Sequence, residues 1–133
     1  MRFPFLSTLA LLACAFTFAD ASAQNARSLK INITQTPSGY SCEYSGGDNA
    51  KGDVTFHVGT KASVTLHVGA GSFTIDKPDI TVDPNDQLSI KSNSPTTAVI
   101  QDTNTVEQVG AYKVTAHAED GTAISCDPGI INQ

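Results

Sequence analysis

The sequence predicts an all-β fold, either a sandwich or a barrel. In many short segments apolar residues occupy every second position, which is the spacing of strands that bury one face. Glycine, proline, asparagine and aspartate gather between these segments at intervals typical of turns in all-β folds. Because no stretch has sustained helical spacing, strands are the predicted elements.

The first two predicted strands flank a turn. Residues 29–33 read Leu-Lys-Ile-Asn-Ile and residues 40–44 read Tyr-Ser-Cys-Glu-Tyr, so apolar and polar side chains alternate in both. Residues 37–39 between them, Pro-Ser-Gly, are typical of a turn. A second turn signal, Ser-Gly-Gly-Asp-Asn, follows at residues 45–49.

The next two predicted strands form a near repeat. Residues 54–59 read Val-Thr-Phe-His-Val-Gly, and residues 64–69 read Val-Thr-Leu-His-Val-Gly. Two copies are too few for a solenoid, which needs at least three. We therefore expect a hairpin that turns through residues 59–62, with valine, phenylalanine and leucine inward and threonine and histidine outward.

The remaining predicted strands are short and separated by further turn signals. Turns are expected at residues 83–86, 94–95 and 119–121, where proline, glycine, serine and acidic residues cluster. The strands cover residues 73–75, 80–82, 88–90, the neighbours of Val99, 112–118 and 124–126, and the last of these is expected to be the final strand.

The N-terminal segment, residues 1–23, has the layout of a cleaved secretory signal peptide. Arg2 supplies the positive end, an apolar stretch follows, and Ala21-Ser22-Ala23 forms a small-residue cleavage site. An alternative cleavage box ends at Cys14, and its use would leave a lipid-anchored protein. We therefore expect a secreted or periplasmic protein with a single domain at residues 24–133 and no membrane span in the mature chain, with anchoring at Cys14 as the alternative.

The mature chain is acidic. Cleavage removes Arg2 and Asp20, so the formal net charge stays at −5. An acidic chain with scattered lysines lacks the basic footprint of a nucleic-acid-binding protein. It also lacks the polybasic patch that favours an anionic membrane. We expect no nucleic-acid partner, and we expect a monomer.

Two cysteines, Cys42 and Cys126, remain after cleavage. A pair of cysteines in an exported protein most simply forms one disulfide. The alternative, a redox or metal-binding pair, lacks support because the two are far apart and neither lies in a Cys-x-x-Cys motif. The sequence therefore favours a structural disulfide between them.

The three histidines are the candidate metal ligands. In the predicted hairpin His57 and His67 face outward and are directly opposite or diagonal, with Cβ atoms ~5–8 Å apart. Imidazoles at that spacing can share Zn²⁺ or Cu²⁺, although two solvated histidines on a threonine-rich face fit the same pattern. His117 joins them only if its strand neighbours the hairpin. The sequence argues against a blue-copper site, because no methionine remains after cleavage and neither cysteine lies in a close arrangement with histidine.

No catalytic motif is present in the sequence. The chain has no Gly-x-Ser-x-Gly elbow and no His-Glu-x-x-His sequence. Acidic residues occur in pairs at 48 and 53, 76 and 79, and 83 and 86, but their spacing is not that of a calcium loop. We interpret these pairs as residues of solvated turns.

Two C-terminal segments carry a family resemblance. Residues 110–116, Gly-Ala-Tyr-Lys-Val-Thr-Ala, followed by Asp120-Gly121, resemble the penultimate strand and last hairpin of bacterial immunoglobulin-like domains. Residues 125–132, Ser-Cys-Asp-Pro-Gly-Ile-Ile-Asn, are similar to the end of small exported bacterial proteins with one β domain and no assigned activity. The resemblance implies an immunoglobulin-like antiparallel β-sandwich. The chain departs from the antibody pattern, because it has no core tryptophan and its second cysteine lies on the last predicted strand, so we expect a disulfide from the second strand to the final strand. The resemblance implies no catalytic residues.

Together these observations favour an exported, non-enzymatic β-sandwich module with a binding role at the cell surface or in the periplasm. Its expected ligand is a protein or a glycan, and no cofactor is expected. One alternative is a divalent-metal-binding protein that uses the outward-facing histidines. Another is a secreted enzyme inhibitor or small hydrolase, which fits the size and export of the chain but has no motif to support it.

Overall fold

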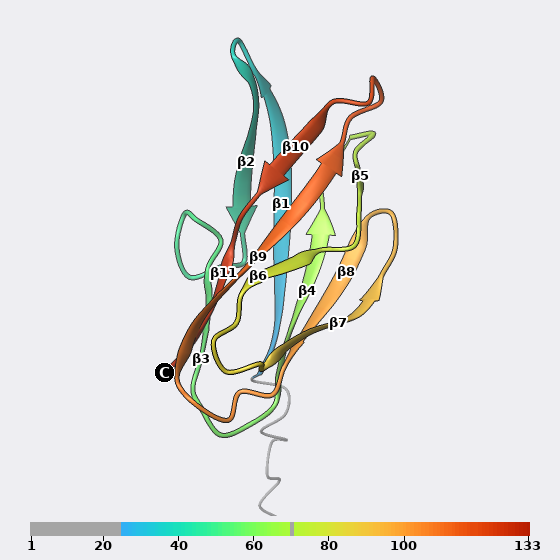
Figure 1. Cartoon of the computed structure of the whole chain (residues 1–133). Coiled ribbons are helices and arrows are strands. Elements are labelled where there is room, and N and C mark those ends of the chain that lie inside the picture. The colour runs from blue at the N-terminus through green and yellow to red at the C-terminus, as the bar shows by residue number, and fades with distance from the viewer. Residues whose placement is uncertain (1–24, 70) are drawn as a thin grey trace, which may run out of the picture.

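The computed structural model describes residues 25–69 and 71–133, which form two β-sheets that face each other (Figure 1). The predicted signal peptide at residues 1–23, including Cys14, lies outside the described residues. The all-β prediction is confirmed, and the two open sheets are arranged as in a β-sandwich. Among the residues that the structure describes, no helix has the length and apolarity needed to cross a membrane.

The first sheet has five strands, in the order β2-β1-β4-β8-β7. Strands β1 and β4 run parallel, whereas the other neighbouring pairs are antiparallel. Strand β2 therefore forms one edge of the sheet and β7 forms the other. The bounds are β1 Ala26–Thr36, β2 Gly39–Ser45, β4 Ala62–Val68, β7 Leu88–Asn93 and β8 Thr97–Asp102.

The second sheet is built around the long strand β9. Strands β10 and β11 pair with successive halves of β9, and β11 also pairs in parallel with β3. Strands β5 and β6 pair with β9 on its opposite edge, because Ala116 is a partner of both Ile75 and Ile124. The bounds are β3 Val54–Phe56, β5 Thr74–Ile75, β6 Asp79–Val82, β9 Gln108–His117, β10 Ala123–Cys126 and β11 Gly129–Asn132.

The core lies between the sheets and consists mainly of aliphatic side chains. Strand β4 shows why these residues form strands, because Ala62, Val64 and Leu66 are buried while the alternate residues Ser63, Thr65 and His67 face outward. Full burial of such a side chain contributes ~1.5–3 kcal/mol. The largest fully buried apolar side chains come from both sheets: Leu29, Ile31, Val64, Leu66 and Ile100 from the first, and Val54, Tyr112, Val114 and Ile130 from the second.

The predicted hairpin of residues 54–58 and 64–68 is wrong. Strand β3 belongs to the second sheet and β4 to the first, so the connection between them crosses the sandwich. Asn104 holds this crossing, since its Nδ2 donates hydrogen bonds to the carbonyl oxygens of His57 and Thr60 at 2.7 and 2.9 Å. The inward and outward directions of the side chains were predicted correctly, because each strand buries one face in its own sheet.

The disulfide between Cys42 and Cys126 is confirmed, with the two Cα atoms 5.9 Å apart. It joins β2, an edge strand of the first sheet, to β10 in the second. The expectation that the second cysteine lies on the final strand is wrong. Strand β10 ends at Cys126, and after Asp127-Pro128 a further strand, β11, follows. The two strands continue along β9 on either side of these two residues.

Candidate binding groove

A groove of about 550 Å³ opens at one end of the sandwich. This end holds the β1–β2 turn, the segment before β5 and the β9–β10 turn, which lie together at the top of Figure 1. The groove is therefore assembled from three segments that are far apart in the sequence, namely the adjoining ends of β1 and β2, the residues before β5, and the turn after β9. Its lining residues are Ile33, Gln35, Tyr40, Ser72, Phe73, Ala118, Glu119 and Asp120.

The apolar part of the groove consists of an aliphatic residue and an aromatic pair. Ile33 lines the groove and belongs to the buried core. The rings of Tyr40 and Phe73 meet edge to face, with their centroids 6.0 Å apart and an angle of 87° between the ring planes. Gly71 supports this position of Phe73, because it has a φ of +129° and a Cβ at this position would lie 3.1 Å from the ring. The aromatic wall thus depends on the contact between the two rings and on the absence of a side chain at position 71.

The acidic rim of the groove comes from the turn between β9 and β10. Gly121 has a φ of +85°, and its amide donates to the carbonyl oxygen of Ala118 at 2.9 Å. The Asp120 carboxylate accepts a hydrogen bond from the amide of Thr122 at 2.9 Å. This hydrogen bond lowers the pKa of Asp120 below its usual value. Glu119 and Asp120 are both exposed, and within residues 25–69 and 71–133 neither forms an ion pair.

This combination of groups suits a ligand that is cationic at one end and apolar beside it. Carboxylates form strong charge-assisted hydrogen bonds with ammonium and guanidinium groups. Aromatic rings attract the same cations through their faces and accept apolar stems by contact. A lysine or arginine side chain of another protein has both features. The groove therefore has the chemistry of a site for a basic side chain in an apolar sequence.

The predicted histidine pair is not brought together. His57 follows β3 in the crossing between the sheets, whereas His67 lies on the outer face of the first sheet, in register with Lys30 and Thr97. The hairpin on which the shared metal site depended is therefore absent. His117 belongs to the second sheet, where its Nε2 lies 2.8 Å from a carboxylate oxygen of Asp76.

No group of three or more histidine, cysteine, aspartate or glutamate residues placed to hold a metal ion occurs in the part of the chain that the structure describes.

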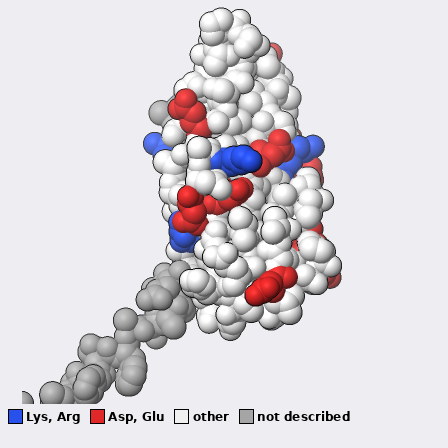
Figure 2. Space-filling model, turned by 90° about the vertical axis from the view of Figure 1, so that its left-hand side faces the viewer, with Lys and Arg blue, Asp and Glu red and all other residues white. Residues whose placement is uncertain are grey.

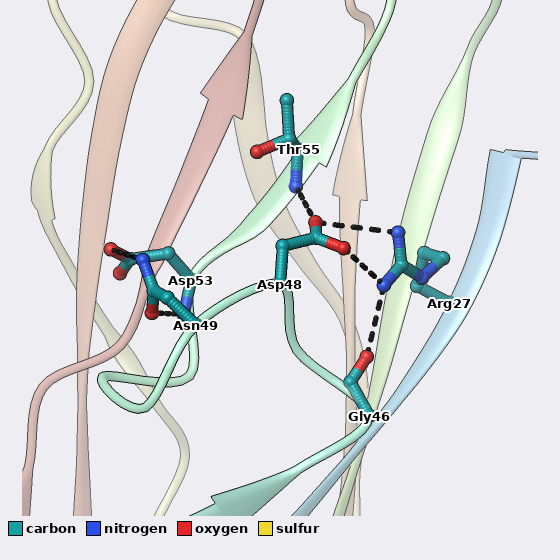
Figure 3. Close-up of polar contacts among 6 residues, drawn as sticks. All are labelled: Arg27, Gly46, Asp48, Asn49, Asp53 and Thr55. Atoms are coloured by element: carbon teal, nitrogen blue, oxygen red, sulfur yellow. Dashed lines mark hydrogen bonds and ion pairs between the residues drawn. The ribbon is translucent and has the colours of Figure 1, made fainter.

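The first acidic pair has a structural role in the loop between β2 and β3 (Figure 3). Asp48 binds the guanidinium of Arg27 at 2.9 Å and accepts a hydrogen bond from the amide of Thr55 at 2.7 Å. These hydrogen bonds lower the pKa of Asp48, and the one from Arg27 has the larger effect. Asn49 donates to the carboxylate of Asp53 at 2.9 Å. Both carboxylates thus satisfy donors of the loop and of β1.

Asp83 has a similar role before β7. Its carboxylate accepts hydrogen bonds from the amides of Gln87 and Leu88 at 2.9 and 2.8 Å, and from the side-chain amide of Gln108 at 2.9 Å. These contacts fix the turn to the start of β9. Asp83 is therefore in a turn, as expected, but its carboxylate is partly buried and hydrogen-bonded to the protein rather than only solvated.

A buried polar cluster at the opposite end of the sandwich was not predicted. One carboxylate oxygen of Asp102 accepts hydrogen bonds from the amide of Asn104 at 2.8 Å and from Nδ2 of Asn132 at 3.2 Å. Asp102 and Asn104 are fully buried, and burial raises the pKa of Asp102. Because Asn104 also holds the β3–β4 crossing, the cluster ties both sheets to this connection.

The comparisons with known proteins show no family. No protein-family model matches the sequence, and no curated protein matches it. Among solved structures, a cysteine protease inhibitor from Entamoeba histolytica aligns with a TM-score of 0.38 and 13% sequence identity, over 61% of this chain and 84% of that chain. A similarity this low carries no functional argument, so function has to be inferred from the residues of the chain itself.

Proposed function

We propose that the chain is an exported β-sandwich module that acts by binding, and that the groove at the β1–β2 end binds a basic side chain within an apolar segment of a partner protein. The observation that carries the proposal is the aromatic pair Tyr40 and Phe73 beside the exposed carboxylates of Glu119 and Asp120. A wall of rings and a rim of two acids match the two halves of a lysine or arginine side chain.

The position of the groove supports a binding role. Loops gathered at one end of a β-sandwich form binding sites in other sandwich proteins, because the sheets hold them in a fixed arrangement. Here Tyr40 is at the start of β2 and Ala118 follows the end of β9, so the two sheets directly position opposite walls of the groove. A rigid frame lowers the entropic cost of ordering the site upon binding.

The disulfide indicates an oxidising compartment outside the cytoplasm. A partner of this module would therefore be a secreted, periplasmic or surface protein. If the partner is a secreted enzyme, binding by this module can inhibit that enzyme. Screening the same protein for inhibition of proteases and of wall-degrading enzymes identifies such inhibition directly.

The proposal is tested by selecting peptides on the immobilised protein expressed from the full chain. The library contains two sets of peptides, which carry either a basic residue (lysine or arginine) or an acidic residue (glutamate) between apolar residues. We expect the basic peptides to be enriched on the wild type and lost on the double variant Glu119→Gln/Asp120→Asn, with affinity lower by about tenfold. Asparagine at position 120 can still accept the hydrogen bond from Thr122, so the turn is preserved.

A matched control removes the same charge elsewhere. Asp86 and Glu107 are exposed and outside the groove, so Asp86→Asn/Glu107→Gln is expected to retain full binding. Phe73→Ala tests the aromatic wall independently of charge. Equal enrichment of basic and acidic peptides, or equal losses in the two double variants, would contradict the proposed role of the groove.

A further inference from the structure

The outer face formed by β1, β4, β7 and β8 differs in charge from the rest of the molecule. The edge strand β2 of the same sheet is not part of this face, since its exposed Glu43 is in register with Asn32 of β1. The chain has a net charge of −5, yet the only acidic residue in β1, β4, β7 and β8 is Asp102, which is fully buried. Lys30, His67 and Lys91 are in these strands, and Lys61 immediately precedes β4. By contrast, Figure 2 shows the side of the molecule that carries β2 and the following loop, where acidic and basic side chains are intermingled.

A second groove, of about 280 Å³, lies on this basic face. It runs across the sheet, since Ser63 of β4 is in register with Ala26 of β1 and with Gln101 of β8. Two lysines and no carboxylates line it. The lining residues are Asn25, Ala26, Thr60, Lys61, Ala62, Ser63, Lys91, Val99 and Gln101.

The lining combines positive charge with side chains that both donate and accept hydrogen bonds. Asn25 and Gln101 have amide groups, and Thr60 and Ser63 have hydroxyl groups. A ligand that satisfies them carries several hydroxyl groups and a negative charge. We propose that this face binds an acidic polysaccharide through its carboxylated sugar units, a role independent of the groove at the β1–β2 end.

The face suits a sugar chain better than other polyanions or a membrane. Specific nucleic-acid sites commonly neutralise about six to ten phosphates, which exceeds the two lysines that line this groove and Lys30 farther along the face. Membrane-surface segments expose large apolar side chains, whereas the exposed large apolar residues of the described chain, Val82, Val106 and Val109, are not in the first sheet.

A longer chain would reach a second basic point on the same face. Lys30 is in register with His67, four residues along β4 from Ser63. At the rise of a β-strand this separation is about 13 Å. A polysaccharide that lies along β4 would therefore contact Lys61 and Lys91 at one end and Lys30 at the other. Binding should accordingly strengthen with the length of the sugar chain.

The test is calorimetric titration of the protein expressed from the full chain with oligogalacturonates of two and six units. Maltohexaose serves as the neutral comparison, and inorganic polyphosphate serves as the comparison that has charge without sugar. We expect the six-unit acid to bind more tightly than the two-unit acid, and binding to weaken with added salt. We expect neither comparison ligand to bind measurably.

Variants locate the site. Lys61→Gln/Lys91→Gln is expected to weaken binding of the six-unit acid at least about tenfold. The control Lys77→Gln/Lys113→Gln removes the same charge from the second sheet, at β9 and at the connection between β5 and β6, and is expected to bind like the wild type. Gln101→Ala keeps the charge of the face and is expected to weaken binding about threefold or more.

Four results would overturn the proposal. The first is no binding of either oligogalacturonate by the wild type. The second is equal weakening in the two double lysine variants, which would indicate attraction by overall charge. The third is polyphosphate binding as tight as that of the six-unit acid, and the fourth is unchanged binding in Gln101→Ala. Either of these last two would remove the role of the sugar hydroxyls.

Discussion

Breaking the disulfide between Cys42 and Cys126 is expected to lower the free energy of unfolding by about 4.6 kcal/mol. The two cysteines are separated by 84 residues in the sequence. Cross-linking so long a loop removes about 15 cal/mol/K of conformational entropy from the unfolded chain, which gives this energy at 25 °C. For a domain of this length the same loss lowers Tm by roughly 20 °C.

Packing adds a smaller effect that has to be separated from the cross-link. Cys126 is only 1% exposed and belongs to the core, so replacement by alanine also removes a buried sulfur atom. Reduced wild type keeps both sulfur atoms and lacks only the bond. Urea unfolding of oxidised wild type, reduced wild type and Cys42→Ala/Cys126→Ala therefore separates the two contributions.

Reduction alone is expected to account for most of the loss, and the alanine variant is expected to lose slightly more than the reduced protein. The unfolding slope m should rise when the bond is broken, because an unlinked chain exposes more surface. A loss of less than about 1.5 kcal/mol upon reduction would refute the argument from loop entropy. The argument would also be refuted if the reduced wild type were as stable as the oxidised protein and only the alanine variant were much less stable.

Three further substitutions probe buried and surface groups by urea unfolding across a pH series. Asp102→Asn is expected to raise the free energy of unfolding at neutral pH by about 1 kcal/mol. The pKa of Asp102 is raised in the native state, so the native state loses stability as pH rises from 3.8 through that pKa, and asparagine avoids this loss. A variant less stable than the wild type at pH 7 would contradict this reasoning. Asp48→Ala is expected to lower the free energy of unfolding by about 1 kcal/mol at neutral pH. Because the pKa of Asp48 is lowered in the native state, this difference from the wild type should disappear as pH falls below 3.8 through that pKa. A difference that persists in acid would point to another cause. Tyr112→Phe is expected to leave stability unchanged or higher by up to about 1 kcal/mol, because the buried hydroxyl has no hydrogen-bond partner in the described residues, and a loss above that amount would show that a partner exists.

The positions of most strands could be predicted because alternation is a local property. Residues 29–33, 40–44 and 64–68 each lie within or coincide with an observed strand. Pairing could not be predicted, because residues 54–58 and 64–68 have the same pattern whether they form a hairpin or lie in opposite sheets. The final strand was missed because Gly129 and Ile130 are both buried, so that β11 lacks alternation.

The groove could not be predicted for a related reason. Tyr40 and Phe73 occupy apolar positions of predicted strands, so the sequence indicates core residues rather than the wall of a site. Their edge-to-face contact arises only when the sheets are stacked. The buried polar cluster was missed because Asn104 and Asn132 resemble the residues of solvated turns. The only sequence signal for this cluster was a polar residue, Asn104, shortly after the alternating strand that ends at Asp102.

The parallel pairing of β3 with β11 also determines the order in which the fold can be completed. Strand β3 pairs with no other strand in the described residues, so it remains without a partner until residues 129–132 have been synthesised. Loop closure between segments so far apart in sequence slows folding, typically to milliseconds or seconds in all-β domains. The second sheet is therefore completed only when residues 129–132 reach β3, so its assembly depends on a pairing that no local hairpin can supply.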